Sequence, residues 1–150
     1  MRRYALCTNA SGAQSATLPL FTVMGAATVR VRIYDMIFSS DATPADQAVT
    51  YRVERVTSAG TPGTSPTANP LDPADPAAIA TCGLAVFTGA PTTAHLAVLQ
   101  FAHNQRATFR WVAAPDGELV IPATAANGLM WLPTVATASF NESFTTQWQE

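Results

Sequence analysis

The sequence predicts an all-β protein, an antiparallel β-sandwich of the jelly-roll type, and three observations support this fold class. Apolar residues recur at every second position in several segments, which is the periodicity of strands with one buried face. Turn residues separate about eight to ten such segments at short intervals. Proline, glycine and β-branched residues interrupt every candidate helix before it reaches about 12 residues.

The alternation is clearest in two segments of the N-terminal half. In 28–38 the residues predicted to face the core are Val29, Val31, Ile33 and Ile37, and those predicted to face away are Arg30, Arg32 and Tyr34. In 48–57 the core-facing set is Val49, Tyr51 and Val53, and the outward set is Thr50, Arg52 and Glu54. A turn region over 39–47 joins these two half-buried strands.

The C-terminal part contains further strands. Segment 107–113 alternates with Phe109 and Trp111 on one side, and Asp116-Gly117 after it predicts a tight hairpin with a return strand over 118–121. Asn127-Gly128 predicts a second turn before 129–132. Segment 135–148 predicts one long strand, or two strands joined by a bend. Weaker strand candidates are 4–9, 18–24, 84–88 and 96–102.

Segment 58–80 differs from the rest of the chain because it is rich in proline and nearly free of charge. Its prolines are Pro62, Pro66, Pro70, Pro73 and Pro76. Both flanks belong to strands of one domain, so we expect a single domain over 1–150 with an extended arm laid over it or over a neighbour, a flexible linker being the alternative. A helical turn over 73–79, capped by Asp72, is predicted within the arm.

Charge is scarce along the chain. Charged residues make up 12% of the sequence, hydrophobic residues 48%, and the formal net charge is −2. A nucleic-acid partner is not expected, because such binders usually carry a basic face. The sequence contains no lysine. Arginine tolerates protein interfaces better than lysine, although a skewed base composition of the gene would also produce this bias.

The N-terminal residues predict a product that is made in a cytoplasm and stays soluble unless an assembly carries it out. No apolar run of signal-peptide length follows Arg2 and Arg3, and no run approaches the roughly 20 residues of a membrane helix. We therefore expect no membrane partner. Cys7 and Cys82 are expected to be buried thiols, with a disulfide between them as the less favoured alternative.

Catalytic, metal-binding and cofactor-binding motifs are not recognised in the sequence, so we expect no enzyme activity, no metal and no cofactor. His95 and His103 lie on one strand parity, about 26 Å apart, too far to share a metal unless the chain turns back. They are expected to be surface or hydrogen-bonded histidines. Asp72 and Asp75 match a capped turn better than a calcium loop.

Candidate partner-binding residues come from two places. Arginines on the outward parity of strands would form a stripe for acidic groups of a partner, or would pair with Glu54 and Glu118. The four arginines are Arg30, Arg32, Arg52 and Arg110. The second group is the start of the proline-rich run and comprises Pro70, Leu71, Asp72 and Pro73. Three tryptophans, Trp111, Trp131 and Trp148, are expected to pack in the core rather than to line a sugar site.

Three runs of the chain resemble those of a family of small structural proteins of tailed bacteriophages, the head decoration or cement proteins. The first run is Thr43-Pro44-Ala45-Asp46-Gln47-Ala48. The second is Pro70-Leu71-Asp72-Pro73-Ala74-Asp75-Pro76-Ala77-Ala78. The third is Asn104-Gln105-Arg106-Ala107-Thr108-Phe109-Arg110-Trp111-Val112-Ala113. The resemblance extends from about residue 30 to residue 150.

The resemblance implies a jelly-roll-like domain that binds the outside of an assembled capsid and stabilises contacts between coat subunits. It implies the major capsid protein as partner, a small homo-oligomer (dimer or trimer), and a place on the virion exterior after synthesis in the host bacterium. A tail or fibre location remains open. The alternative function is a carbohydrate-binding virion module, which would need aromatic side chains in a solvent-facing cleft.

Overall fold

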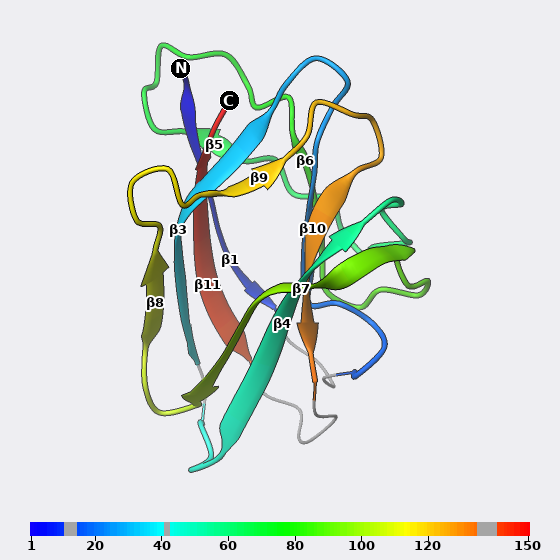
Figure 1. Ribbon diagram of the computed structural model, residues 1–150. Helices are drawn as coiled ribbons and strands as arrows, with labels where there is room; N and C mark the ends of the chain where they lie inside the picture. Colours follow the sequence, from blue (N-terminus) through cyan, green and yellow to red (C-terminus); the bar gives the residue numbers. More distant parts are fainter. Residues whose placement is uncertain (11–14, 41–42, 135–140) are drawn as a thin grey trace.

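The computed structural model describes residues 1–10, 15–40, 43–134 and 141–150, apart from the side chains of residues 10 and 94–96. The described elements are all strands, and they form two antiparallel sheets packed against each other (Figure 1). The six-stranded sheet contains, in order, β5 (Asn69–Pro70), β1 (Arg3–Ala10), β11 (Glu142–Gln149), β3 (Val31–Ser40) and β8 (Phe109–Val112), with β9 (Leu119–Ile121) also paired to β3. The five-stranded sheet contains, in order, β6 (Thr81–Leu84), β2 (Phe21–Met24), β10 (Gly128–Pro133), β4 (Ala48–Val56) and β7 (Thr93–Asn104). No helix able to cross a membrane occurs in these residues.

The strand pairing is nested. Strand β1 pairs with β11, β2 with β10, β3 with β8 and β9, and β4 with β7, all antiparallel. The outermost strands in the sequence thus pair with each other, and each inner pair alternates between the two sheets. A long hairpin rolled onto itself gives this order, which is that of a jelly roll. The all-β sandwich predicted from the sequence is confirmed.

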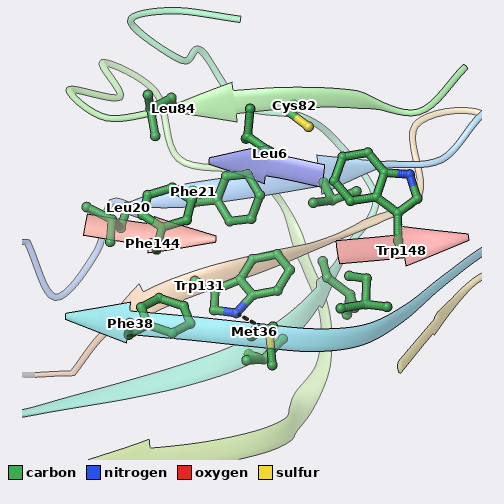
Figure 2. Packing of buried hydrophobic residues seen from close by; sticks show 14 of the residues in the cluster. Leu6, Leu20, Phe21, Met36, Phe38, Cys82, Leu84, Trp131, Phe144 and Trp148 are labelled. Atoms are coloured by element: carbon green, nitrogen blue, oxygen red, sulfur yellow. Dashed lines mark hydrogen bonds between the residues drawn. The ribbon is translucent and has the colours of Figure 1, made fainter. Parts of the chain in front are cut away.

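The core between the sheets is rich in aromatic rings. Phe21 lies 4.7 Å from Trp131 and 4.8 Å from Phe144, centroid to centroid. The indole Nε1 of Trp131 donates a hydrogen bond to the sulfur of Met36 at 3.2 Å (Figure 2). Buried Trp nitrogen atoms usually need such a partner. These rings come from both sheets, so they hold the two layers together.

A β-bulge in β3 corrects one prediction of the alternation. Ile33 is opposite Trp148, but Asp35 is opposite Gln147, so Tyr34 is an extra residue in β3. An extra residue moves every later side chain to the opposite face. Met36 and Phe38 are therefore fully buried, and Ile37, which the alternation assigned to the core, is half-buried on the outer face.

The prediction of a hairpin at Asp116-Gly117 is also wrong. A turn exists there, with Asp116 at a φ of 61° and the Gly117 amide donating to the Ala114 carbonyl. However, β8 and β9 pair with consecutive parts of β3 and not with each other. The turn is therefore an excursion within one interrupted edge strand.

The proline-rich segment 58–80 lies against its own domain. Thr61 pairs with Gly89, Thr64 pairs with Leu84, and β5 pairs with β1. The predicted helical turn over 73–79 is a β-turn instead, in which the Asp75 amide donates to the Asp72 carbonyl and the Ala74 amide to the Asp72 carboxylate. The cap is present, but no helical turn follows it.

The same connection, together with Phe87, lies against the outer face of the five-stranded sheet at β6. A Cβ added to Gly83 would lie 3.0 Å from Pro62 and 3.1 Å from the ring of Phe87, so both residues sit directly on the strand at this point. Phe87 is 3% exposed. Four further side chains form a second buried cluster that is separate from the main core, namely Met24, Val56, Met130 and Leu132.

The two ends of the chain lie side by side at one end of the sandwich (Figure 1). Arg2 and Glu150 exchange two backbone hydrogen bonds, of 3.0 and 2.9 Å. The carboxylate of Glu150 also accepts hydrogen bonds from the amides of Ile79 and Ala80 and from the indole of Trp148. One side chain therefore ties the last strand to the end of the proline-rich segment.

Candidate protein-binding face

The outer face of the six-stranded sheet differs from that of the five-stranded sheet in its side chains. We call the outward side of β1, β11, β3 and β8 the open face. Strand pairing places small or uncharged residues along most of it. In β1 and β11 they are Ala5, Cys7, Asn9, Ser143, Thr145, Gln147 and Gln149. Ile37 lies opposite Thr145, and Val112 on β8 is 57% exposed.

Two arginines flank the end of this face nearest the chain termini. Gln149 pairs with Arg3 on one side and with Arg32 on the other, so the three side chains form a row across three strands. Neither arginine has a carboxylate within 4.0 Å among the described residues. Both therefore keep their planar donor groups available for an acidic partner.

Arg3 was not among the arginines singled out in the sequence. It is the first residue of β1 and points outward, and the weak strand candidate over 4–9 began one residue too late to include it. Arg30 precedes β3 and is exposed. The sequence signal that would have found Arg3 is its position one residue before the buried Tyr4, in a strand whose alternation starts there.

The two remaining arginines of the predicted stripe form ion pairs, and only Arg110, opposite Ile37, lies on the open face. Arg110 makes a two-pronged contact with Asp35, with nitrogen to oxygen distances of 3.1 and 2.7 Å. These hydrogen bonds and the carboxylate charge raise the pKa of Arg110. Arg52 belongs to the five-stranded sheet, where its side chain lies 3.2 Å from Glu54. The four arginines therefore do not form one stripe.

The start of the proline-rich run lies at the edge of the open face, beside β1. Pro70 is in β5, and the Leu71 amide donates to the Arg3 carbonyl. Leu71 is 45% exposed, and Asp72 and Pro73 are also exposed. This group thus adjoins the Arg3 end of the row.

The tryptophans do not line a site for sugar. Trp131 and Trp148 are fully buried, and Trp111 is partly buried and packs against the core. No Phe, Tyr or Trp side chain in the described ranges is classed as exposed. The expected packing of the three indoles in the core is confirmed.

A histidine and a carboxylate are buried together between the two sheets. His103 Nε2 on β7 lies 3.1 Å from Glu142 Oε1 on β11, and their side chains are 3% and 0% exposed. Burial lowers the pKa of His103. The hydrogen bond to Glu142 and the charge of Glu142 both raise this pKa, and the net change is upward. Burial first, and then Glu142, raises the pKa of Tyr51. Because His103 and Glu142 belong to different sheets, their contact links the two sheets.

These residues do not make a metal site. Within the described part of the chain, no three His, Cys, Asp or Glu side chains are placed to share an ion. The side chain of His95 lies outside the described residues. Asp72 caps the turn and Asp75 lies 3.6 Å from Arg2, so each of these carboxylates has a structural role.

The two cysteines are not paired. Cys82 is buried, and burial raises its pKa to about 12. Cys7 is exposed on the open face opposite Thr145, so the expectation that it is a buried thiol is wrong. Cys7 is exposed because it follows the core-facing Leu6 in β1 and therefore points outward.

Comparison of the chain with protein-family models, with curated proteins and with solved structures found no match.

Proposed function

We propose that this protein is a capsid decoration protein of a bacteriophage, which docks on the assembled coat through its open face. The observation that carries the proposal is the character of this face. It is a sheet surface left uncovered by the chain's own connection, and most of its side chains are uncharged. Its charged groups include the Arg110–Asp35 pair and two arginines, Arg3 and Arg32, that are free of ion pairs among the described residues. Arginine is enriched in protein interfaces, and acidic residues are depleted.

The size of the face favours several weak contacts over one strong contact. With the length of the eight-residue strands β1 and β11, the four-stranded face covers roughly 26 Å by 19 Å, on the order of 500 Å². A stable pairwise interface usually buries about 800 Å² on each partner. One face alone is therefore at the weak end of the range, and firm attachment would come from contacts with more than one coat subunit.

Such a surface would recognise the assembled lattice rather than free coat protein. Docking across a junction between subunits means that separating them also breaks the decoration contacts. Because the ligand binds only the assembled state, it stabilises that state by mass action. In this proposal the arginines meet acidic groups of the major capsid protein, the protein is made in the bacterial cytoplasm and ends on the virion exterior, and it has no catalytic role.

The alternative is a carbohydrate-binding virion module. It would need exposed rings on which a sugar could stack. The burial of Trp131 and Trp148 removes the most favourable platforms from the described surface. We therefore test this function in the same experiment, in which glycan binding would replace the first proposal.

The test is co-sedimentation of the protein with empty shells of the phage that encodes it, beside free coat protein and a panel of glycans. We expect saturable binding to shells at a fixed copy ratio and none to free subunits. The double variant Arg3→Glu/Arg32→Glu should weaken shell binding at least about tenfold, since two buried charge-assisted contacts are each worth about 1.5–3 kcal/mol.

The matched control is Arg106→Glu, which alters an exposed arginine of the β7–β8 connection at the other end of the sandwich. It should bind shells as the wild type does. Equal binding by both variants would remove the open face from the interface. Glycan binding without shell binding would move the protein to the carbohydrate-binding class.

A further inference from the structure

The free edges of the two sheets differ in how well they are protected against pairing with another chain. Exposed edge strands are usually short, charged, interrupted by proline or covered. Strand β5 has two residues and contains Pro70, which lacks an amide proton. Strand β8 has four residues and carries the exposed Arg110. Strand β6 also has four residues, and Thr64 pairs with Leu84 beside it.

Strand β7 has none of these protections in its second half. It is 12 residues long and contains no Asp, Glu, Lys, Arg or Pro. Its first half is irregular, because the register with β4 shifts twice. From Leu99 to Asn104, however, every residue pairs in sequence with β4. Within the described residues, no backbone hydrogen bond reaches Leu99 to His103 from the side opposite β4.

We propose that this edge of β7 pairs with the same edge of a second copy of the chain. The two strands would run antiparallel about a two-fold axis and would join two five-stranded sheets into one continuous sheet. The pairing does not depend on the proposed function, but it supplies the homo-oligomer that a weak docking face needs. It also leaves the open face of each copy uncovered, because that face belongs to the other sheet.

A second copy is a suitable partner for this edge for two reasons. A two-fold axis matches each amide of an antiparallel strand with a carbonyl of its identical partner, so the edge is complementary to itself. A symmetric pair also places like residues near like residues, and charges there would repel. The absence of charge in β7 removes this obstacle.

The side chains restrict the register of the pair. Ala102 and Gln100 point outward and are exposed, whereas Phe101 and His103 point inward. Registers that keep outward residues opposite outward residues are centred on Gln100, Phe101 or Ala102. The register centred on Phe101 places Gln100 opposite Ala102 of the other copy and brings the two Phe101 rings together, which would bury what remains exposed of them.

The experiment measures molar mass by sedimentation equilibrium over a range of protein concentrations. We expect a reversible dimer for the wild type. The variant Gln100→Glu/Ala102→Glu places like charges opposite each other in all three registers, so its dimer should be about tenfold or more weaker. The variant Gln100→Glu/Ala102→Arg should dimerise at least as well as the wild type if the register is centred on Phe101.

Two controls complete the test. Ser143→Glu/Thr145→Glu adds the same charge to the open face and should leave the dimer unchanged. Amide hydrogen exchange of the wild type should show protection of the β7 edge that increases with protein concentration, a readout that needs no variant. A wild type that stays monomeric, or a Glu/Glu variant that associates as the wild type does, would overturn the proposal. If the Glu/Glu variant loses the dimer but still binds shells, the β7 pairing and the capsid proposal are shown to be independent of each other.

Discussion

The outer faces of the two sheets are built for different surroundings. The face of the five-stranded sheet carries Met24, Val56 and Met130, each less than 5% exposed, and the chain's own connection lies on this side with Phe87. The open face of the six-stranded sheet carries Ser143 and Thr145 and is not covered in this way. The comparison shows that the open face is not a hydrophobic surface that merely lacks a covering segment. Its side chains tolerate water, and because most of them are uncharged, contact with another protein avoids the larger cost of burying unpaired charges.

The largest contrast that we expect from this comparison is in thiol reactivity. Cys7 is exposed on the open face, whereas Cys82 is buried and its pKa is raised to about 12. Only the thiolate reacts, so at neutral pH the native protein should consume one equivalent of a maleimide quickly and a second at least about 1,000-fold more slowly. Mass spectrometry of the labelled peptides identifies the site. Cys7→Ser should abolish the fast phase, and two fast phases would contradict the burial of Cys82.

The next effect is the cost of removing one side chain from each outer face. Phe87→Ala should lower the free energy of unfolding by about 3 kcal/mol, because it empties the contact between the connection and Gly83. Val112→Ala on the open face, where the side chain is 57% exposed, should stay within about 0.5 kcal/mol of the wild type. Urea titration followed by tryptophan fluorescence measures both. Equal losses would mean that the two faces do not differ as described.

The smallest effect concerns pH and the pair that links the two sheets. The pKa of His103 is raised in the folded state by Glu142, despite the opposing effect of burial. The protonated histidine therefore stabilises the fold fully below the unfolded pKa of about 6.5, and this contribution is lost as the pH rises through the folded pKa. We expect the free energy of unfolding to be lower at about pH 9 than at about pH 6.

His103→Gln provides the control for this pH dependence. It should be less stable than the wild type at about pH 6, because removing one member of a buried ion pair leaves the other without its partner charge. Its unfolding midpoint should then change less between the two pH values than that of the wild type. An unchanged pH profile in the variant would assign the dependence to other groups.

The sequence predicted the architecture because period-two alternation survives wherever one sheet face is buried. Phe144 and Trp148 lie inward in β11, and Phe109 and Trp111 pack against the core from β8, as the alternation predicted. It failed at Ile37, because a bulge cannot be read from the types of residues around it. Residues 135–140, the first part of the strand predicted over 135–148, lie outside the described residues.

The candidate site was less predictable than the fold. Arg32 was found because a strong alternation surrounds it, whereas Arg3 lies at the first residue of a strand with weaker alternation. The placement of Arg52 on the other sheet could not be predicted, because strand order depends on long-range pairing. The burial of His103 with Glu142 joins residues almost 40 positions apart, and no local pattern specifies such a contact.

The adjacent ends of the chain determine where this protein tolerates additions. Arg2 and Glu150 are hydrogen-bonded to each other, and the next pair along the same strands is Arg3 with Gln149, at the basic end of the open face. An affinity tag or fluorescent protein fused to either end would emerge beside the row of Arg3, Gln149 and Arg32 and would sterically hinder any partner that binds there. The exposed turn at Asp116-Gly117 is the better place for an insertion, because it lies within an interrupted edge strand.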